Sequence, residues 1–132
     1  LLAYAEVQNE AVGPDQSVYD AINEVRDRVD LPALENGLTQ EEMRKAIYQE
    51  RRVELAFEDK RYLDLIRLKL AEKNLNGHMH AMLIEKEGGV WKYKVIPATQ
   101  GEMVFHAEKN YLFPIPQAAM DRNPNLTQNP GY

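Results

Sequence analysis

The start of the chain carries a helical repeat of apolar side chains with one break. Leu1–Glu10 predicts a helix, and Gly13-Pro14 ends it because neither residue favours a helix interior. A second helix begins after Asp15 or Ser17, each of which can cap a first turn. Its apolar positions follow the i, i+4, i+7, i+11 spacing of one helix face: Val18, Ile22, Val25 and Val29. Residues 1–30 therefore predict an antiparallel helical hairpin similar to a tetratricopeptide repeat.

A second helical region is predicted over residues 38–72, where charged and apolar side chains are most mixed. Thr39 and Glu42 form a capping-box pattern, and Leu38 with Met43 fits the hydrophobic staple across the same cap. Asp59 can cap a following helix, which we expect to end near residue 70. Between these caps an apolar stripe recurs at helical spacing: Met43, Ala46, Ile47, Val53 and Phe57.

Glu50 and Glu54 lie one helical turn apart beside this stripe. Like charges at this spacing repel each other, so buried carboxylates here require cationic partners. We expect a structural charge network that joins the two carboxylates to nearby side chains: Arg51, Arg52, Arg61, Asp64 and Arg67. The alternative is a general acid/base pair, since carboxylates about 5–6 Å apart approach the separation in retaining glycosidases. Arginine neighbours lower carboxylate pKa values, which opposes that role, and no catalytic residue is assigned.

After residue 77 the apolar pattern changes from helical to alternating. The segments MLIEKE and VWKYKVI flank Gly88-Gly89, a pair typical of a tight hairpin turn. Alternation places Trp91, Tyr93 and Val95 on one face of the second strand. Trp91 and Tyr93 fit two roles: a ligand-binding platform on which sugar rings stack, or packing against the helices. The second role is the more common one for cross-strand aromatic side chains.

The last part of the chain predicts short strands followed by an extended tail. Met103–Phe113 fits a further strand or extended segment, within a strand-containing region over 78–113. The two prolines of YLFPIP end ladder pairing. Over 114–132 we expect a tail that wraps over a surface, with one or two helical turns at Gln117–Arg122.

Composition excludes several classes of function. The chain has 132 residues, enough for one compact domain, and its formal net charge of −5 opposes electrostatic binding of nucleic acid. The absence of Cys removes thiol catalysis and cysteine-based zinc sites. His78 and His80, with His106 or a carboxylate, lack convincing metal-ligand spacing, so neither a metal nor another cofactor is predicted. No apolar run approaches the ~20 residues that span a bilayer.

Three stretches together resemble the C-terminal part of the SusD/RagB family of outer-membrane nutrient-binding lipoproteins. They are YAEVQNEAVGP with YDAINEVRDRV, then AIYQERRVELAFEDKRYLDLIR, and finally YLFPIPQAAMDRNPNLTQNPGY. These stretches cover most of the chain and follow the family's order. Two positions depart from the family pattern, because Asp59 stands where Gly is usual and Leu68 stands where an aromatic side chain often follows the arginine.

The resemblance implies a mainly α fold, with tetratricopeptide-like helix pairs and a small irregular part that contains short strands. It implies that the chain is the C-terminal part of a SusD/RagB-like domain, divided as 1–30, 38–72, 78–113 and 114–132. It further implies non-enzymatic binding of glycans or other oligomeric nutrients at the cell surface, and their delivery to a SusC-like TonB-dependent outer-membrane transporter. Membrane attachment would come from an N-terminal lipid anchor outside this segment, whose lack of an initiator Met predicts a fragment or a processed piece.

Two other functions stay open at this point. One is a structural or protein-interaction helical module without ligand binding of its own. The other is a carbohydrate-active enzyme that uses Glu50 and Glu54. The matching motifs belong to the framework of the family, so they carry over no ligand-binding residue. Trp91 and Tyr93 are therefore candidates on strand geometry alone.

Overall fold

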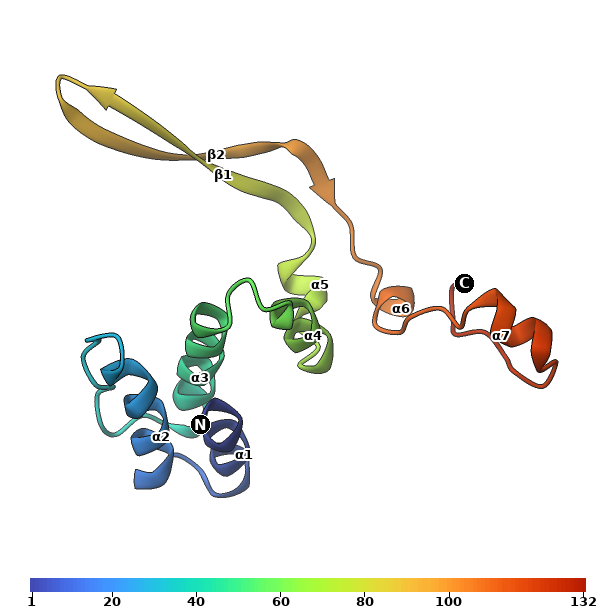
Figure 1. The fold of residues 1–132 in the computed structure, drawn as a ribbon, viewed down its shortest axis with the longest axis horizontal. Helices are drawn as coiled ribbons and strands as arrows, with labels where there is room; N and C mark the ends of the chain where they lie inside the picture. The colour runs from blue at the N-terminus through green and yellow to red at the C-terminus, as the bar shows by residue number, and fades with distance from the viewer. The chain divides into compact units, whose positions relative to one another are not determined.

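The computed structural model describes every residue of the chain except the side chain of Gln100, which lies in a strand. The fold is mainly helical, with a small antiparallel sheet. The chain divides into two compact units, which we name the helical unit (Leu1–Arg61) and the hairpin unit (Tyr62–Tyr132) (Figure 1). In chain order the elements are α1 (Leu2–Val12), α2 (Gln16–Asp27), α3 (Gln40–Glu54), α4 (Lys60–Arg67), α5 (Ala71–Asn74), β1 (Gly77–Glu87), β2 (Val90–Met103), α6 (Ala107–Asn110) and α7 (Gln117–Arg122).

Side-chain caps fix the starts of α2 and α3. The Asp15 carboxylate accepts a hydrogen bond from the N–H of Val18 (3.2 Å), which pairs an otherwise free donor in the first turn of α2. In α3 the Thr39 hydroxyl accepts a hydrogen bond from the N–H of Glu42, and the Glu42 carboxylate accepts one from the N–H of Thr39 (2.8 Å). Both predicted helix starts are confirmed, including the capping box.

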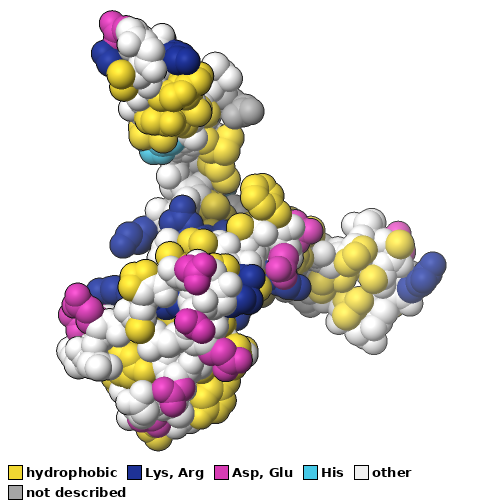
Figure 2. Space-filling model, turned by 60° about the vertical axis from the view of Figure 1, so that its left-hand side comes forward, with side chains coloured by type: hydrophobic (Ala, Val, Ile, Leu, Met, Phe, Trp, Pro, Cys, Tyr) yellow, Lys and Arg dark blue, Asp and Glu magenta, His cyan; other side chains and the backbone are white. Residues whose placement is uncertain are grey.

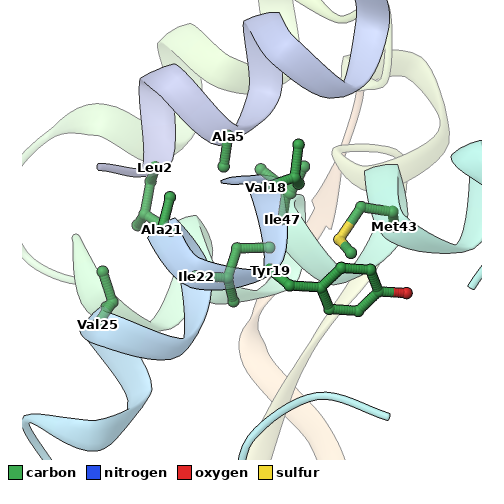
Figure 3. Packing of buried hydrophobic residues seen from close by; sticks show 9 residues of the cluster. All are labelled: Leu2, Ala5, Val18, Tyr19, Ala21, Ile22, Val25, Met43 and Ile47. Carbon is green, nitrogen blue, oxygen red and sulfur yellow. The ribbon is translucent and has the colours of Figure 1, made fainter. Parts of the chain in front are cut away.

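The three helices of the helical unit bury a shared core (Figure 3). Its members are Leu2 and Ala5 of α1, Val18, Tyr19, Ala21, Ile22 and Val25 of α2, and Met43 and Ile47 of α3. Ile22, Met43 and Ile47 are completely buried. Full burial of an aliphatic side chain of this size contributes about 1.5–3 kcal/mol. Two hydrogen bonds also join α1 to α3, because the side-chain amide of Asn9 donates to the Gln40 carbonyl (3.1 Å) and that of Gln40 donates to the Asn9 carbonyl (2.6 Å).

The α2 helix ends at a cap that the apolar pattern does not reveal. Asp30 adopts a left-handed conformation with φ of 56°, and the N–H of Leu31 donates to the Arg26 carbonyl (3.0 Å), as in a Schellman motif. Val29 lies within this cap and stays 44% exposed. Its predicted place on the buried stripe of α2 is therefore wrong.

The buried stripe of α3 also ends early. The helix stops at Glu54, and the turn that follows places Phe57 at a positive φ of 65°. Val53 is 58% exposed and Phe57 is fully exposed, so neither joins Met43 and Ile47 in the core. This part of the prediction is wrong because the helical repeat was extended past the residue at which the helix breaks.

The α4 helix ends at Arg67, before the expected end near residue 70. Lys69 turns the chain with φ of 55°, and the N–H of Leu70 donates to the Leu65 carbonyl (2.9 Å). Just before the helix, Asp59 has φ of 56°. This left-handed conformation costs less for Gly than for a residue with a Cβ, so Asp59 is a strained position in the turn before α4.

The hairpin unit has a smaller core of its own. Leu65, Ala71 and Phe105 are buried, and the rings of Phe105 and Tyr111 meet edge to face with centroids 4.8 Å apart. The Asn76 side chain joins the two ends of the hairpin, because its Oδ1 accepts a hydrogen bond from the backbone N–H of Phe105 (2.6 Å) and its Nδ2 donates one to the Phe105 carbonyl (3.2 Å). These two hydrogen bonds close the base of the hairpin, and a third from the Asn76 amide to the Glu72 carbonyl (3.0 Å) joins it to α5.

The predicted hairpin is confirmed. β1 and β2 pair antiparallel on either side of Gly88 and Gly89, whose φ values of 57° and 85° are both positive, as a type I′ turn requires. The register is regular from the turn as far as His80 opposite Pro97, and it shifts before His78. Extra residues in β2 at this shift form a bulge, which ends the regular part of the ladder.

Over Met103–Phe113, where a further strand or an extended segment was predicted, no strand follows Met103 and α6 interrupts the extended segment. β2 ends at Met103, and α6 begins four residues later. At the start of α6 the Asn110 side chain accepts a hydrogen bond from the N–H of His106 (2.7 Å), which favours a helical turn. The helical turns predicted in the tail are confirmed by α7. After α7 the tail folds back, because the Gln128 side chain exchanges two hydrogen bonds with the backbone of Ile115 (2.8 and 2.9 Å). Each helix in the described part of the chain is too short or too polar to cross a lipid bilayer.

Candidate functional site

The hairpin presents two chemically different faces. Residues directly opposite each other in an antiparallel pair lie on the same face, and side chains alternate along each strand. One face, which we name the aromatic face, consists of the opposed pairs Lys86–Trp91, Ile84–Tyr93 and Met82–Val95. The other face carries the pairs Glu87–Val90, Glu85–Lys92 and Leu83–Lys94. The predicted neighbours Trp91, Tyr93 and Val95 therefore do share one face.

The aromatic face is open to solvent. Trp91 and Tyr93 keep 55% and 65% of their surface exposed, and Ile84 and Val95 keep 54% and 60%. Figure 2 shows hydrophobic side chains gathered along the hairpin. The interpretation that Trp91 and Tyr93 pack against the helices is wrong, because a two-stranded hairpin has no further layer of its own to cover either face. The small core of the hairpin unit uses Phe105 instead.

Charged side chains are distributed unevenly between the two faces. Lys86 belongs to the aromatic face, and its Nζ lies 5.3 Å from the centroid of the Trp91 ring, within the range of a cation–π interaction. Glu85 and Glu87 belong to the opposite face, where Glu87 forms an ion pair with Lys92. The three opposed pairs of the aromatic face thus carry one cation and no carboxylate.

The carboxylates Glu50 and Glu54 lie in the helical unit, and each pairs with an arginine from the end of α2. Arg26 donates from Nη1 to Glu50 (2.7 Å) and from Nε to the Pro32 carbonyl (2.8 Å). Arg28 donates to both carboxylate oxygens of Glu54, at 2.8 Å each. Sequence analysis missed both arginines because they are distant in sequence. The sequence signal that could have identified them is their position in, and just after, the last turn of α2.

The other members of the expected charge network belong to different helices and have different contacts. Arg51 lies 3.9 Å from a carboxylate of α1. Arg67 Nε donates to the Asp64 carboxylate (2.8 Å) within α4. Arg61 is half-buried, whereas Arg52 is exposed. The described ion pairs of Glu50 and Glu54 therefore use α2 rather than the arginines that follow them in sequence.

These contacts favour a structural role for Glu50 and Glu54. Glu50 is only 8% exposed, and its carboxylate is engaged by a guanidinium. Glu54 is engaged through both of its oxygens. A general acid or base must reach a proton of the substrate within hydrogen-bond distance, which a carboxylate already engaged by a guanidinium does not offer. We therefore assign these residues to the scaffold.

The histidines pair with single carboxylates. His78 Nε2 lies 3.1 Å from Glu102, and His106 Nδ1 lies 3.7 Å from Glu108. The register shift of the hairpin falls between the pairs that His78 and His80 form with β2. Among the residues that the structure describes, no three histidine or acidic side chains are grouped closely enough to hold a metal ion.

A hollow of about 370 Å³ lies beside α2 and the loop that follows it. It is lined by Asp20, Asn23, Glu24, Asp27, Leu31 and Ala33. Asn23 already has a structural role, since its side-chain oxygen accepts a hydrogen bond from the N–H of Leu34 (2.9 Å). The lining contains no aromatic ring on which a sugar could stack. The aromatic face is therefore the better candidate site.

Known proteins with similar sequences and folds share one family name. The model of the SusD family matches residues 1–132. SusD-like protein P2 of Formosa agariphila is 31% identical over 140 residues, which cover 100% of this chain and 24% of that protein. The crystal structure of a SusD-like protein from Bacteroides fragilis has a TM-score of 0.81 and 30% identity, covering 99% of this chain and 24% of that one.

A SusD homolog from Bacteroides thetaiotaomicron has a TM-score of 0.69 and 32% identity, and it covers 99% of this chain and 25% of its own. The chain thus spans about a quarter of the length of the relatives that it matches. The family model matches this chain over its whole length, from residue 1 to residue 132. The resemblance noted in the sequence is confirmed, and the chain belongs to the SusD family.

Proposed function

We propose that this chain forms the C-terminal part of a surface-exposed outer-membrane protein that binds glycans or other oligomeric nutrients without enzymatic turnover. The observation that carries the proposal is the match to the SusD family over residues 1–132. In this proposal the bound nutrient passes to a SusC-like TonB-dependent transporter. The protein is held at the membrane by an N-terminal lipid anchor outside this segment.

Trp91 and Tyr93 are the residues to which we assign ligand contact. Their rings are more than half exposed, and each has a polar atom at its tip that tolerates water. Neighbouring side chains on one face of a strand are about 7 Å apart, so the two rings offer successive contact points to an extended chain of sugar rings. Stacking and hydrogen bonds to hydroxyl groups need no catalytic group, which agrees with a role in capture.

The helical unit has the role of scaffold in this proposal. Residues 1–30 supply α1 and α2, and the first part of the predicted region 38–72 supplies α3. We propose that α1 and α2 correspond to one tetratricopeptide-like pair. The shared core of these two helices and the exposed apolar side chains of α1, such as Val7 at 69%, support this assignment. Residues 78–113 and 114–132 supply the binding hairpin and the tail.

Binding to a glycan array tests the proposal. The full-length protein is compared with Trp91→Ala, Tyr93→Ala and the control Leu83→Ala, whose side chain lies on the opposite face. We expect both aromatic variants to lose glycan binding at an unchanged melting temperature, and the control to bind normally. Oligosaccharides recovered after long incubation should be unchanged. Shortened products would contradict the absence of turnover, and full binding by both aromatic variants would contradict the assigned site.

A second candidate is a helical module for protein interaction without ligand binding of its own. The exposed apolar side chains of the helical unit favour it, including Val7, Val12 and Phe57. Such side chains suit contact with another polypeptide. Retention of a SusC-like transporter in a pull-down, with no binding to any glycan on the array, would favour this candidate over glycan capture.

A further inference from the structure

We propose that the aromatic face selects acidic saccharides, in which the sugar rings stack on Trp91 and Tyr93 while Lys86 pairs with a carboxylate or sulfate group. This inference rests on the proposed function, because it names the class of glycan that the same site would take. It goes beyond the proposed function because it assigns a role in ligand recognition to Lys86, the charged residue opposite Trp91.

The position of Lys86 is the first step. It is directly opposite Trp91 in the ladder, and its ammonium group lies 5.3 Å from the ring centroid. The ammonium group lies over the ring, because the face of an indole attracts a positive charge. A saccharide that stacks on this face takes the place of the ammonium group there, and the flexible stem of Lys86 keeps the cation within reach of the substituents on the sugar ring.

The charge distribution over the hairpin is the second step. Among the residues that the structure describes, Lys86 forms no ion pair with a carboxylate, whereas Lys92 on the opposite face is paired with Glu87. Glu85 also lies on that opposite face, so no acidic group in the regular part of the ladder, between its His80–Pro97 pair and the turn, repels an anion from the aromatic face. A cation in this setting attracts an anionic group more strongly than a cation already paired with a carboxylate.

The far end of the aromatic face is the third step. His80 opposite Pro97 continues the same face beyond Val95, since the register is regular to that point. An imidazole ring adds a hydrogen-bonding nitrogen, and again no carboxylate. The polar ends of the face thus suit acceptor groups of a ligand, while its apolar middle suits the C–H surfaces of sugar rings.

The net charge of −5 does not oppose this site. Fields of exposed charges are screened within about 10 Å at 0.1 M salt, so the side chains that decide the local field are those of the hairpin itself. On the aromatic face these are cationic or neutral. A second polypeptide could also cover an apolar face, but a face that groups two rings with a fixed cation favours an anionic saccharide.

Matched pairs of charged and neutral polysaccharides test the inference. The probes are polygalacturonate with its methyl ester, and dextran sulfate with dextran. Each is titrated against the full-length protein, the variant Lys86→Gln and the control Lys94→Gln, whose side chain lies on the opposite face. We expect the unmodified protein to prefer the charged member of a pair. Lys86→Gln should weaken that binding about tenfold without changing binding of the neutral member, and Lys94→Gln should change neither.

Quenching of Trp91 fluorescence supplies a readout without a ligand. The difference between the full-length protein and its Trp91→Phe variant isolates the signal of this ring, and the ratio of iodide to caesium quenching should exceed that of free tryptophan amide because a cation lies beside the ring. Lys86→Gln should lower this ratio toward that of free tryptophan amide. Protection of Trp91 from both ions would mean that a polypeptide covers the aromatic face, and it would overturn the inference.

The remaining outcomes separate the inference from the proposed function. Equal binding of charged and neutral members, or unchanged binding by Lys86→Gln, would overturn the acidic preference and leave glycan capture intact. Failure to bind any member of either pair, on a protein that also fails on the glycan array, would overturn both.

Discussion

The helical unit and the hairpin unit use isoleucine in opposite ways. Ile22 of α2 is completely buried among side chains from three helices, whereas Ile84 of β1 is 54% exposed on the aromatic face. Both residues follow the apolar pattern of their own element. The difference is that the helices provide each other with a second layer, and the two strands do not.

This comparison separates the part of the chain that maintains the fold from the part that is free to bind. Apolar surface removed from water stabilises the folded state by roughly 25 cal/mol per Å². The rings of the aromatic face contribute little to stability in this way, since Trp91 and Tyr93 remain more than half exposed. Substitutions should therefore act on stability in the helical unit and on binding in the hairpin.

The matched pair Ile22→Ala and Ile84→Ala should show the largest contrast. Removal of a fully buried isoleucine loses transfer free energy and leaves a cavity, so we expect Ile22→Ala to lower the free energy of unfolding by about 3–4 kcal/mol. Ile84→Ala should lower it by less than about 0.5 kcal/mol. Chemical denaturation followed by circular dichroism measures both values. Equal losses would mean that the hairpin is buried in solution.

Glu50→Gln and Glu54→Gln test the comparison within the helical unit itself. The Arg26–Glu50 pair is mostly buried, so the loss of one charge leaves the other without a partner, and we expect a cost of about 3 kcal/mol. Arg28 in the Arg28–Glu54 pair is 61% exposed, and solvent screens that interaction to less than about 1 kcal/mol. The same denaturation experiment ranks the two variants. A larger loss of stability from Glu54→Gln than from Glu50→Gln would contradict the idea that burial makes the Arg26–Glu50 pair the stronger of the two.

Two substitutions in the turn test how far the hairpin depends on backbone conformation. Gly89 has φ of 85° with open space around it, so Gly89→Ala should cost about 1–2 kcal/mol through the left-handed conformation alone. The control Gly88→Asn creates the Asn-Gly pair that type I′ turns favour, and it should be close to neutral. Amide hydrogen exchange in β1 and β2 reports the effect. Faster exchange in the control than in Gly89→Ala would contradict a type I′ turn.

Local signals in the sequence were sufficient where the structure depends on local contacts. The cap of α3 was predictable because Thr39 and Glu42 are three positions apart and satisfy each other's backbone groups. The turn at Gly88 and Gly89 was predictable because few residues adopt positive φ at two successive positions. The start of α2 at Asp15 was predictable for the same local reason.

Contacts between distant residues set the limits of the prediction. Glu50 could be expected to need a cation, but its partner Arg26 becomes a neighbour only after α2 packs beside α3. The ends of α2 and α4 were missed because Asp30 and Lys69 supply the left-handed caps in place of the usual Gly. The exposure of Trp91 was missed because an alternating pattern identifies a face without showing what covers it.

Acid should act on the helical unit through its carboxylate hydrogen bonds, with the smallest effect of the four. Arg44 donates to both oxygens of Glu10 at 2.6 Å, and these hydrogen bonds lower the pKa of the Glu10 carboxyl. Hydrogen bonds from Ser17 and from Thr39 lower the pKa values of Asp15 and Glu42 in the same way. A lowered pKa in the folded state means that the unfolded state binds protons more readily as the pH falls.

The stabilisation from Glu10 is therefore complete above the carboxyl pKa of the unfolded chain, near pH 4, and is lost as the pH falls through the lower pKa of the folded state. At pH 7 Glu10→Gln should be less stable than the unmodified protein by less than about 1 kcal/mol, because the pair is partly exposed. The two melting temperatures should converge as the pH falls from about 5, where the carboxyl of the unfolded chain begins to bind protons, through the lower pKa of the folded state. A constant difference over this range would show that the contribution of Glu10 does not depend on its charge, and that the contact with Arg44 acts through packing of the two side chains.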